Sequence, residues 1–219
     1  MMSDTNQGDG LFEPAEKLPD GTVIRLRLIR PEDEPLLQDF AAHMSPEDLR
    51  LRFFAAMRGL SPMLAARLSH IDYDRDAALL AFAEGAEEVL GEARFSADPD
   101  YHAGEVAIAV RSDWKGHGLG HLLMARLIEL ARQRGIDGLV GNVLPENAAM
   151  LRLCREFGFT IGIDPSDPKL LRVSKTLYLH RVTARRPRDH ARQLPFHLAA
   201  PRRDRRRPAL HRAAAGEYG

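Results

Sequence analysis

The sequence has very little cysteine: Cys154 is the only one among 219 residues. A single cysteine excludes an internal disulfide and a metal cluster held by several thiolates. No apolar run approaches the roughly 20 residues of a membrane-spanning helix, and no signal-peptide pattern opens the chain. The hydrophobic fraction of 44% and charged fraction of 28% are typical of a globular protein. We therefore expect a cytoplasmic protein with no membrane partner.

The net charge is zero, but the charges are unevenly distributed along the chain. From His180 onward there are 11 arginines against 3 acidic residues, whereas residues 1–179 hold 20 basic and 28 acidic residues. The arginines of residues 202–207 could neutralise phosphates, but no aromatic residues stand among them to stack on bases, so we expect no specific nucleic-acid partner. Residues 1–20 and 180–219 lack periodicity and predict a disordered leader and a basic disordered tail around one domain, 21–179.

Alternating and helical patterns within this domain predict a mixture of strands and helices. In order, the predicted elements are a strand over 22–29, three helices near 31–43, 46–52 and 62–69, a hairpin of 77–84 and 88–96, a strand over 105–110, a long helix over 118–134, a strand over 138–144, a helix over 147–157, and strands over 159–163 and 170–179. This order predicts an α+β fold with a mixed sheet.

Three glycines at alternate positions open the long helix, and no Ser, Thr, Asp or Asn is placed to cap its first turn. Glycine lets backbone amides approach a ligand closely, and the helix N-terminus carries a positive dipole end. Gly116, Gly118 and Gly120 therefore predict a phosphate or pyrophosphate site. A flexible loop before an ordinary helix is the alternative.

Two motifs in this order of elements resemble the GNAT superfamily of acyl-CoA-dependent N-acetyltransferases. The first is Lys115-Gly116-His117-Gly118-Leu119-Gly120, with Lys115 where the family has Gln or Arg, and the second runs from Asn147 to Gly158-Phe159. Within the superfamily, the likeness is greatest to the catalytic domain of bacterial Pat-type protein lysine acetyltransferases. It rests on segments such as Leu51-Arg52-Phe53-Phe54, Ile71-Asp72-Tyr73-Asp74-Arg75 and Leu144-Pro145-Glu146-Asn147.

The resemblance implies a GNAT fold, with a mostly antiparallel central sheet that is flanked by helices and splayed at the cofactor site. It implies direct transfer of acetyl from acetyl-CoA, in a ternary complex and without a metal, to lysine side chains of a protein such as an acyl-CoA synthetase. A small-molecule amine as acceptor is one alternative. A non-catalytic acyl-CoA-binding sensor module is another.

The resemblance also assigns residues to the co-substrate. Backbone groups of Ile108, Ala109 and Val110 would pair with the pantetheine arm, and Asn147 would hydrogen-bond to it or simply cap the helix that follows. The amides of the glycine loop would hold the pyrophosphate; these residues are Lys115, Gly116, His117, Gly118, Leu119 and Gly120. Lys115 would add a point charge rather than a planar fork.

Glu105 is the candidate general base. The strand period places it on one face with Ala107 and Ala109, which leaves room for a substrate beside the carboxylate. A lysine amine has an ordinary pKa of about 10.4, so a base must take its proton at neutral pH. A catalytic glutamate at this position is what the resemblance implies; a strand-edge glutamate paired with a surface arginine is the alternative.

Cys154 occupies the position where many GNAT enzymes carry a tyrosine that acts as general acid. Its thiol could donate a proton to the departing thiolate, or it could be a small buried hydrophobic residue. Asp72, Tyr73 and Asp74 could line a cleft for a cationic acceptor, or form a polar turn. These acids lack the glycine and distal glutamate of a calcium loop, so we expect no metal there.

Overall fold

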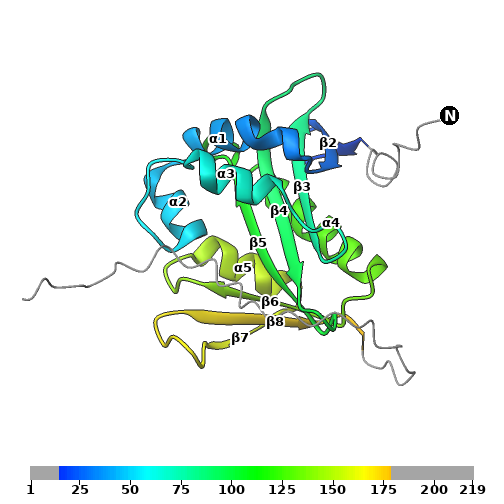
Figure 1. Cartoon of the computed structure of the whole chain (residues 1–219), viewed down its shortest axis with the longest axis vertical. Coiled ribbons are helices and arrows are strands. Elements are labelled where there is room, and N and C mark those ends of the chain that lie inside the picture. Colours follow the sequence, from blue (N-terminus) through cyan, green and yellow to red (C-terminus); the bar gives the residue numbers. More distant parts are fainter. Residues whose placement is uncertain (1–14, 179–219) are drawn as a thin grey trace, which may run out of the picture.

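The computed structural model describes residues 15–178, and the predicted basic tail and the first 14 residues of the predicted leader lie outside the described residues. Within this range one eight-stranded sheet has the order β1-β2-β3-β4-β5-β6-β8-β7 (Figure 1). Neighbouring strands pair antiparallel except β5 and β6, which are parallel. The predicted α+β class with a mixed, mostly antiparallel sheet is confirmed.

The elements follow the predicted order closely. The strands are β1 (Glu16–Lys17), β2 (Val23–Leu28), β3 (Asp76–Ala83), β4 (Val89–Ala97), β5 (Ala103–Val110), β6 (Gly138–Val143), β7 (Thr160–Ile163) and β8 (Leu171–Thr176). The helices are α1 (Glu34–Ala42), α2 (Pro46–Phe53), α3 (Pro62–Ser69), α4 (Leu119–Gln133) and α5 (Ala148–Glu156), with short 3-10 turns at Pro31–Asp33 and Ser112–Trp114.

The folded part begins before residue 21, where the predicted domain starts. β1 pairs with β2 through Glu16 and Lys17, and Leu18 is buried in the core. A strand of two residues is too short to show an alternating pattern, so the sequence pattern could not separate it from the leader.

Serine caps fix the starts of α2 and α3, the two helices that border the site. Ser45 accepts a hydrogen bond from the backbone N–H of Asp48 at the start of α2, and Ser61 accepts one from that of Leu64 at the start of α3. In both helices a proline follows at the first helical position, where its missing N–H costs nothing. The Ser-Pro pairs therefore set the helix starts that the sequence predicts.

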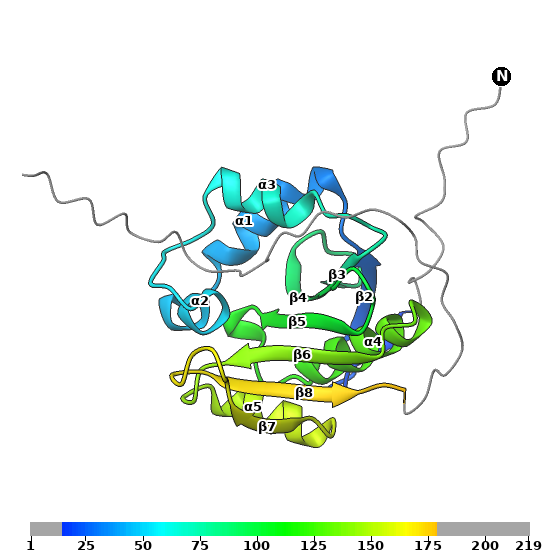
Figure 2. The same ribbon diagram turned by 60° about the horizontal axis from the view of Figure 1, so that its bottom comes forward.

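Two hydrophobic clusters cover the two faces of the sheet. Side chains of α4 and α5 pack on one face, and those of α1, α2 and α3 pack on the other (Figure 2). The alternation of β5 divides its residues between them, because Val106 packs in the α4 cluster and Ala109 in the α1–α3 cluster. Glu105 and Ala107 share the second face with Ala109.

The sheet opens between β5 and β6. Their pairing joins Ala103, Gly104 and Glu105 to Gly138, Leu139 and Val140 and stops there, whereas β5 stays paired with β4 through Val110. Figure 1 shows the two strands running apart from this point. Glu105 is therefore the last paired residue before an open strand edge.

Candidate active site

The glycine loop forms the N-terminus of α4 without a side-chain cap. Gly116 has φ 86° and Gly118 has φ 89°, a left-handed conformation that other residues adopt at a cost. Gly118 is the N-cap residue, and no side chain hydrogen-bonds to the first turn. The backbone N–H groups at this positive end of the helix are therefore presented to any anion in front of them.

Two side chains of the loop are held by carboxylates. Lys115 Nζ forms an ion pair with the buried Asp48 of α2, and His117 Nδ1 lies 2.8 Å from an Asp20 carboxylate oxygen. Asp48 also accepts hydrogen bonds from Ser45 at 2.8 Å and Ser112 at 2.5 Å. Burial raises the pKa of Asp48, but the hydrogen bonds from Lys115, Ser112 and Ser45 outweigh it and hold that pKa below its ordinary value.

The open edge of β5 presents backbone groups of alternate residues. The N–H of Arg111 donates to Leu90 of β4 at 2.9 Å, and a Cβ built on Gly91 would lie 3.3 Å from the carbonyl oxygen of Ala109. Residues 109 and 111 therefore face β4, so by alternation Ile108 and Val110 direct their N–H and C=O groups to the open side. Of the three predicted backbone contacts, these two lie at the open edge.

A groove of about 720 Å³ runs from the glycine loop along this edge to α5, and we call it the loop groove. It is lined by Lys115, Gly116, Gly118, Leu119 and Gly120, by Ile108, Ala109 and Val110, and by Asn147. The Asn147 side chain accepts a hydrogen bond from the N–H of Met150 at 3.1 Å and so caps α5. Asn147 also lines the groove, so the predicted hydrogen bond to a bound molecule would be a second role beside this cap.

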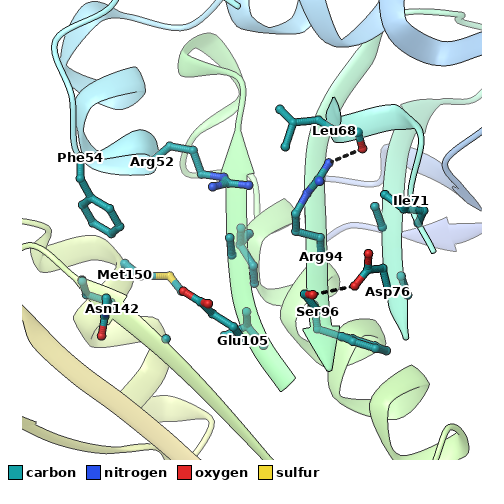
Figure 3. Close-up of a pocket in the computed structure, with 18 of the residues that line it drawn as sticks. Arg52, Phe54, Leu68, Ile71, Asp76, Arg94, Ser96, Glu105, Asn142 and Met150 are labelled. Carbon is teal, nitrogen blue, oxygen red and sulfur yellow. Dashed lines mark hydrogen bonds between the residues drawn. The ribbon is translucent and has the colours of Figure 1, made fainter. Parts of the chain in front are cut away.

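A second cavity of about 440 Å³, here called the inner cavity, lies behind the open edge between α2, α3 and strands β3 to β6. Figure 3 shows Glu105 and Arg52 extending into this space from opposite sides, with the Glu105 carboxylate directed toward Met150. The inner cavity and the loop groove share the lining residues Leu51, Arg52, Ile108, Asn147 and Met150. The two spaces therefore meet beside β5 at Ile108, three residues after Glu105.

A buried charge cluster that the sequence reasoning missed forms one wall of the inner cavity. Arg94 donates to the buried Glu92 through Nε at 2.5 Å and to the carbonyl oxygen of Leu68 at 3.1 Å. Arg52 Nη2 lies 3.6 Å from the other Glu92 oxygen. Burial raises the pKa of Glu92, but Arg94 and Arg52 hold it below its ordinary value; burial lowers the pKa of Arg52 against the opposing effect of Glu92. Charged residues at alternate positions of an apolar strand were the signal for this cluster.

The predicted acidic segment after α3 is divided by the structure. Asp72 and Asp76 line the inner cavity, whereas Tyr73 donates its hydroxyl to the carbonyl oxygen of Ile29 at 2.9 Å. The N–H of Asp74 donates to Asp72 at 3.1 Å, which is a turn contact. The segment is thus a polar turn that contributes Asp72 to the cavity wall, and Asp76 at the start of β3 adds a second carboxylate.

Cys154 lies on the buried face of α5, fully covered by the core, and belongs to the lining of neither space. Burial raises the pKa of its thiol to about 11. A thiol that is packed among apolar residues behaves as a small hydrophobic side chain, so this geometry favours the structural alternative for Cys154.

No helix among residues 15–178 is long and apolar enough to cross a membrane. Within the same range no three His, Cys, Asp or Glu side chains gather as a metal site would require.

Comparison with known proteins gives the geometry its context. The acetyltransferase (GNAT) family matches residues 45–159. Acetyltransferase PA5475 of Pseudomonas aeruginosa is 32% identical over 169 residues, which cover 76% of this chain and 87% of that protein. An L-methionine sulfoximine/L-methionine sulfone acetyltransferase of Pseudomonas paraeruginosa is 36% identical over 88 residues, which cover 38% of this chain and 51% of that protein.

Among solved structures, the GNAT domain of S. lividans PAT superimposes with a TM-score of 0.69 and 27% identity, covering 75% of this chain and 96% of that domain. The fold and the Pat-type likeness predicted from the sequence are thereby confirmed. The chain belongs to the GNAT family of acetyltransferases, enzymes that use acetyl-CoA as their acetyl donor.

Proposed function

We propose that this chain transfers acetyl from acetyl-CoA to a primary amine held in the inner cavity, with Glu105 as the general base. The observation that carries the proposal is the position of Glu105 at the last β5–β6 pair, in the wall of the cavity that joins the loop groove. An amine that enters the cavity meets this carboxylate before it reaches the open strand edge.

The loop groove fits acetyl-CoA. Uncapped amides at the start of α4 suit a pyrophosphate, and the outward backbone groups of Ile108 and Val110 suit the amides of a pantetheine arm that lies along β5 as an added strand. Asn147 lines the same groove. Lys115 adds positive charge near the phosphates while its ion pair with Asp48 fixes the loop. Acetyl-CoA, once bound, supplies an activated acetyl thioester.

Glu105 makes the amine nucleophilic. An alkyl ammonium with a pKa of about 10 must lose a proton before it can attack at neutral pH, and Glu105 takes that proton directly or through a water molecule. The nitrogen then forms a bond to the acetyl carbon while the bond from that carbon to sulfur breaks. A second nitrogen proton is lost and the thiolate gains one, so that ammonium and thioester give amide, free thiol and one released proton.

Two acceptors fit this chemistry. Lysine side chains of a protein, such as an acyl-CoA synthetase, are supported by the 27% identity to the S. lividans PAT domain. A small amine is supported by the relative named for L-methionine sulfoximine and by the inner cavity, whose volume of about 440 Å³ is in the range of small-molecule sites, roughly 300–1,000 Å³. A binding module without turnover is the remaining alternative.

Mass spectrometry on two acceptor pools tests the proposal. The purified chain is incubated with acetyl-CoA and either a chemically deacetylated cell lysate or a mixture of amino acids and polyamines, with Glu105→Gln in parallel. We expect acetylated amines in at least one pool with the unaltered chain and none above background with the variant. Acetyl-CoA binding measured by calorimetry, together with no acetylated amine in either pool, would favour the binding module.

A further inference from the structure

Arg52, in the wall of the inner cavity, carries two N–H-bearing atoms that make no hydrogen bond. The side chain of Arg52 is 5% exposed, and its Nε and Nη2 atoms are buried without a hydrogen-bond partner. Buried N–H groups of a charged side chain that lack acceptors are costly, because they have lost water and gained nothing in exchange. Arg52 lines the inner cavity, so a shift of its side chain toward that space would give these N–H groups an acceptor atom from a bound molecule.

The surrounding charges leave the same deficit. Arg94 engages one oxygen of Glu92 through Nε and Nη2, whereas Arg52 stands 3.6 Å from the other oxygen, too far for a hydrogen bond. Two guanidinium groups thus share one buried carboxylate, and Arg52 is the more weakly held of the two. The positive charge of Arg52 that Glu92 does not hold faces Glu105 across the cavity (Figure 3).

The position of Arg52 relative to Glu105 indicates which kind of molecule could bind at Arg52. The Glu105 carboxylate exerts a favourable electrostatic effect on Arg52, and the two side chains extend into the cavity from opposite sides (Figure 3). A cavity with a positive group on one side and a negative group on the other is complementary to a zwitterion whose carboxylate lies at the positive group and whose ammonium lies at the negative group. An α-amino acid carries its ammonium and its carboxylate on one carbon.

We propose that Arg52 binds the carboxylate of the acceptor, an α-amino acid, and so places the α-amine beside Glu105. This inference rests on the proposed acetylation of a primary amine and adds the class of substrate; the transfer step itself is unchanged. A lysine ε-ammonium has no carboxylate near its nitrogen, so it leaves the Arg52 N–H groups unmatched. The geometry thus favours the small-molecule acceptor over the protein lysine.

A different role for Arg52 follows from its place in the walls of both spaces. Its N–H groups could instead stabilise negative charge on the thioester carbonyl oxygen during transfer. The two roles differ in one measurable respect, because stabilisation of the thioester oxygen helps every amine equally, whereas a carboxylate site helps only amines that carry a carboxylate.

The first test uses the unaltered chain and three matched acceptors: L-leucine, L-leucinamide and 3-methylbutylamine. Release of CoA thiol gives kcat and KM for each. We expect kcat/KM for leucine to exceed both others by tenfold or more, mainly through KM, because charge-assisted hydrogen bonds to a carboxylate are among the strong ones. The amine of leucinamide loses its proton more easily than that of leucine, so proton affinity cannot produce a preference for leucine over leucinamide, and this comparison decides the test.

The second test removes the cation. Arg52→Gln should raise KM for leucine at least tenfold while kcat/KM for 3-methylbutylamine stays within threefold. Arg58→Gln, which removes the same charge from an exposed position outside both spaces, is the control and should change leucine kinetics less than threefold. Thermal unfolding shows that each variant is folded.

Equal loss for all three amines in Arg52→Gln would overturn the carboxylate site in favour of the thioester role. Acetylation by the unaltered chain with no preference for leucine over its amide would overturn it without any variant, and would leave amine acetylation intact. Bound acetyl-CoA with no acetylated amine would overturn the proposed function and this inference together.

Discussion

The loop groove and the inner cavity meet at Ile108 and Arg52, yet they are built in different ways. The groove is formed by backbone: glycines at positive φ, uncapped amides at the start of α4 and the open edge of β5. The cavity is formed by residues of α2, α3, α5 and five strands, and two arginines of its wall form a buried cluster with one glutamate.

This difference follows from what each space has to recognise. Backbone amides and a helix dipole suit a phosphate and an amide arm, which are the same in every reaction of a family that shares one donor. Charged side chains distinguish one acceptor from another, because an unmatched buried charge rejects the wrong molecule. We therefore propose that the groove binds the donor and that the cavity selects the acceptor. The following substitutions test that division.

The largest effect is expected from Glu105→Gln, which acts on the cavity side alone. Removal of a general base typically lowers kcat by about 10²–10⁴-fold, and the dissociation constant for acetyl-CoA should stay within about twofold. Steady-state kinetics and calorimetry measure the two quantities, with Glu87→Gln, on the exposed turn before β4, as control. If Glu105→Gln lost acetyl-CoA binding as strongly as turnover, the two spaces would act as one site and the division between them would be contradicted.

Asp48→Asn tests the contact between the two regions, because Asp48 of α2 holds Lys115 of the glycine loop. We expect a loss of about 1–3 kcal/mol in the free energy of unfolding, kept low because Lys115 is half exposed. KM for acetyl-CoA should rise several-fold while KM for the amine changes little. Urea unfolding and initial rates measure both.

The same variant carries a pH signature. The pKa of Asp48 is lowered in the folded chain, so its stabilising contribution is present above the unfolded value of about 3.9 and is lost as the pH falls through the folded value. The difference in unfolding free energy between the unaltered chain and Asp48→Asn should therefore be constant near neutral pH and shrink below about pH 4. A difference that grows on acidification would contradict the ion pair.

Gly118→Ala and Gly116→Ala sharpen the account of the groove. Both residues have positive φ, which costs a side chain about 1–2 kcal/mol. A Cβ at Gly118 would also lie 3.0 Å from Cδ of Pro19, whereas one at Gly116 would meet nothing within 4 Å. The melting temperature of Gly118→Ala should therefore be lower than that of Gly116→Ala. Equal melting temperatures would show that the Pro19 contact does not affect stability.

The smallest effect is expected from Cys154→Ala. The thiol is buried outside both spaces, so kcat and its pH profile should stay within about twofold of the unaltered chain, and the free energy of unfolding should fall by about 1 kcal/mol for the lost packing. Rates from pH 6 to 10 check this. A tenfold drop in kcat would restore Cys154 as a general acid.

The same contrast explains what the sequence could predict. The groove depends on a contiguous motif, Lys115 to Gly120, and on helices that begin at Ser-Pro pairs, so local patterns located it. The cavity depends on Arg52, Glu92 and Glu105, which come from separate elements and meet only in the folded sheet. Periodicity placed Glu105 on its strand face but carried no information on a partner about 50 residues away.

The pH dependence of the Glu105→Gln defect tests the central claim most directly. The ratio of kcat/KM between the unaltered chain and the variant is measured from pH 6.5 to 10.5 with one amine and saturating acetyl-CoA. If Glu105 removes the amine proton, the ratio should fall toward about 1 as the amine becomes neutral without help near its own pKa. A ratio that stays constant across this range would contradict a general base and leave Glu105 a structural part of the cavity wall.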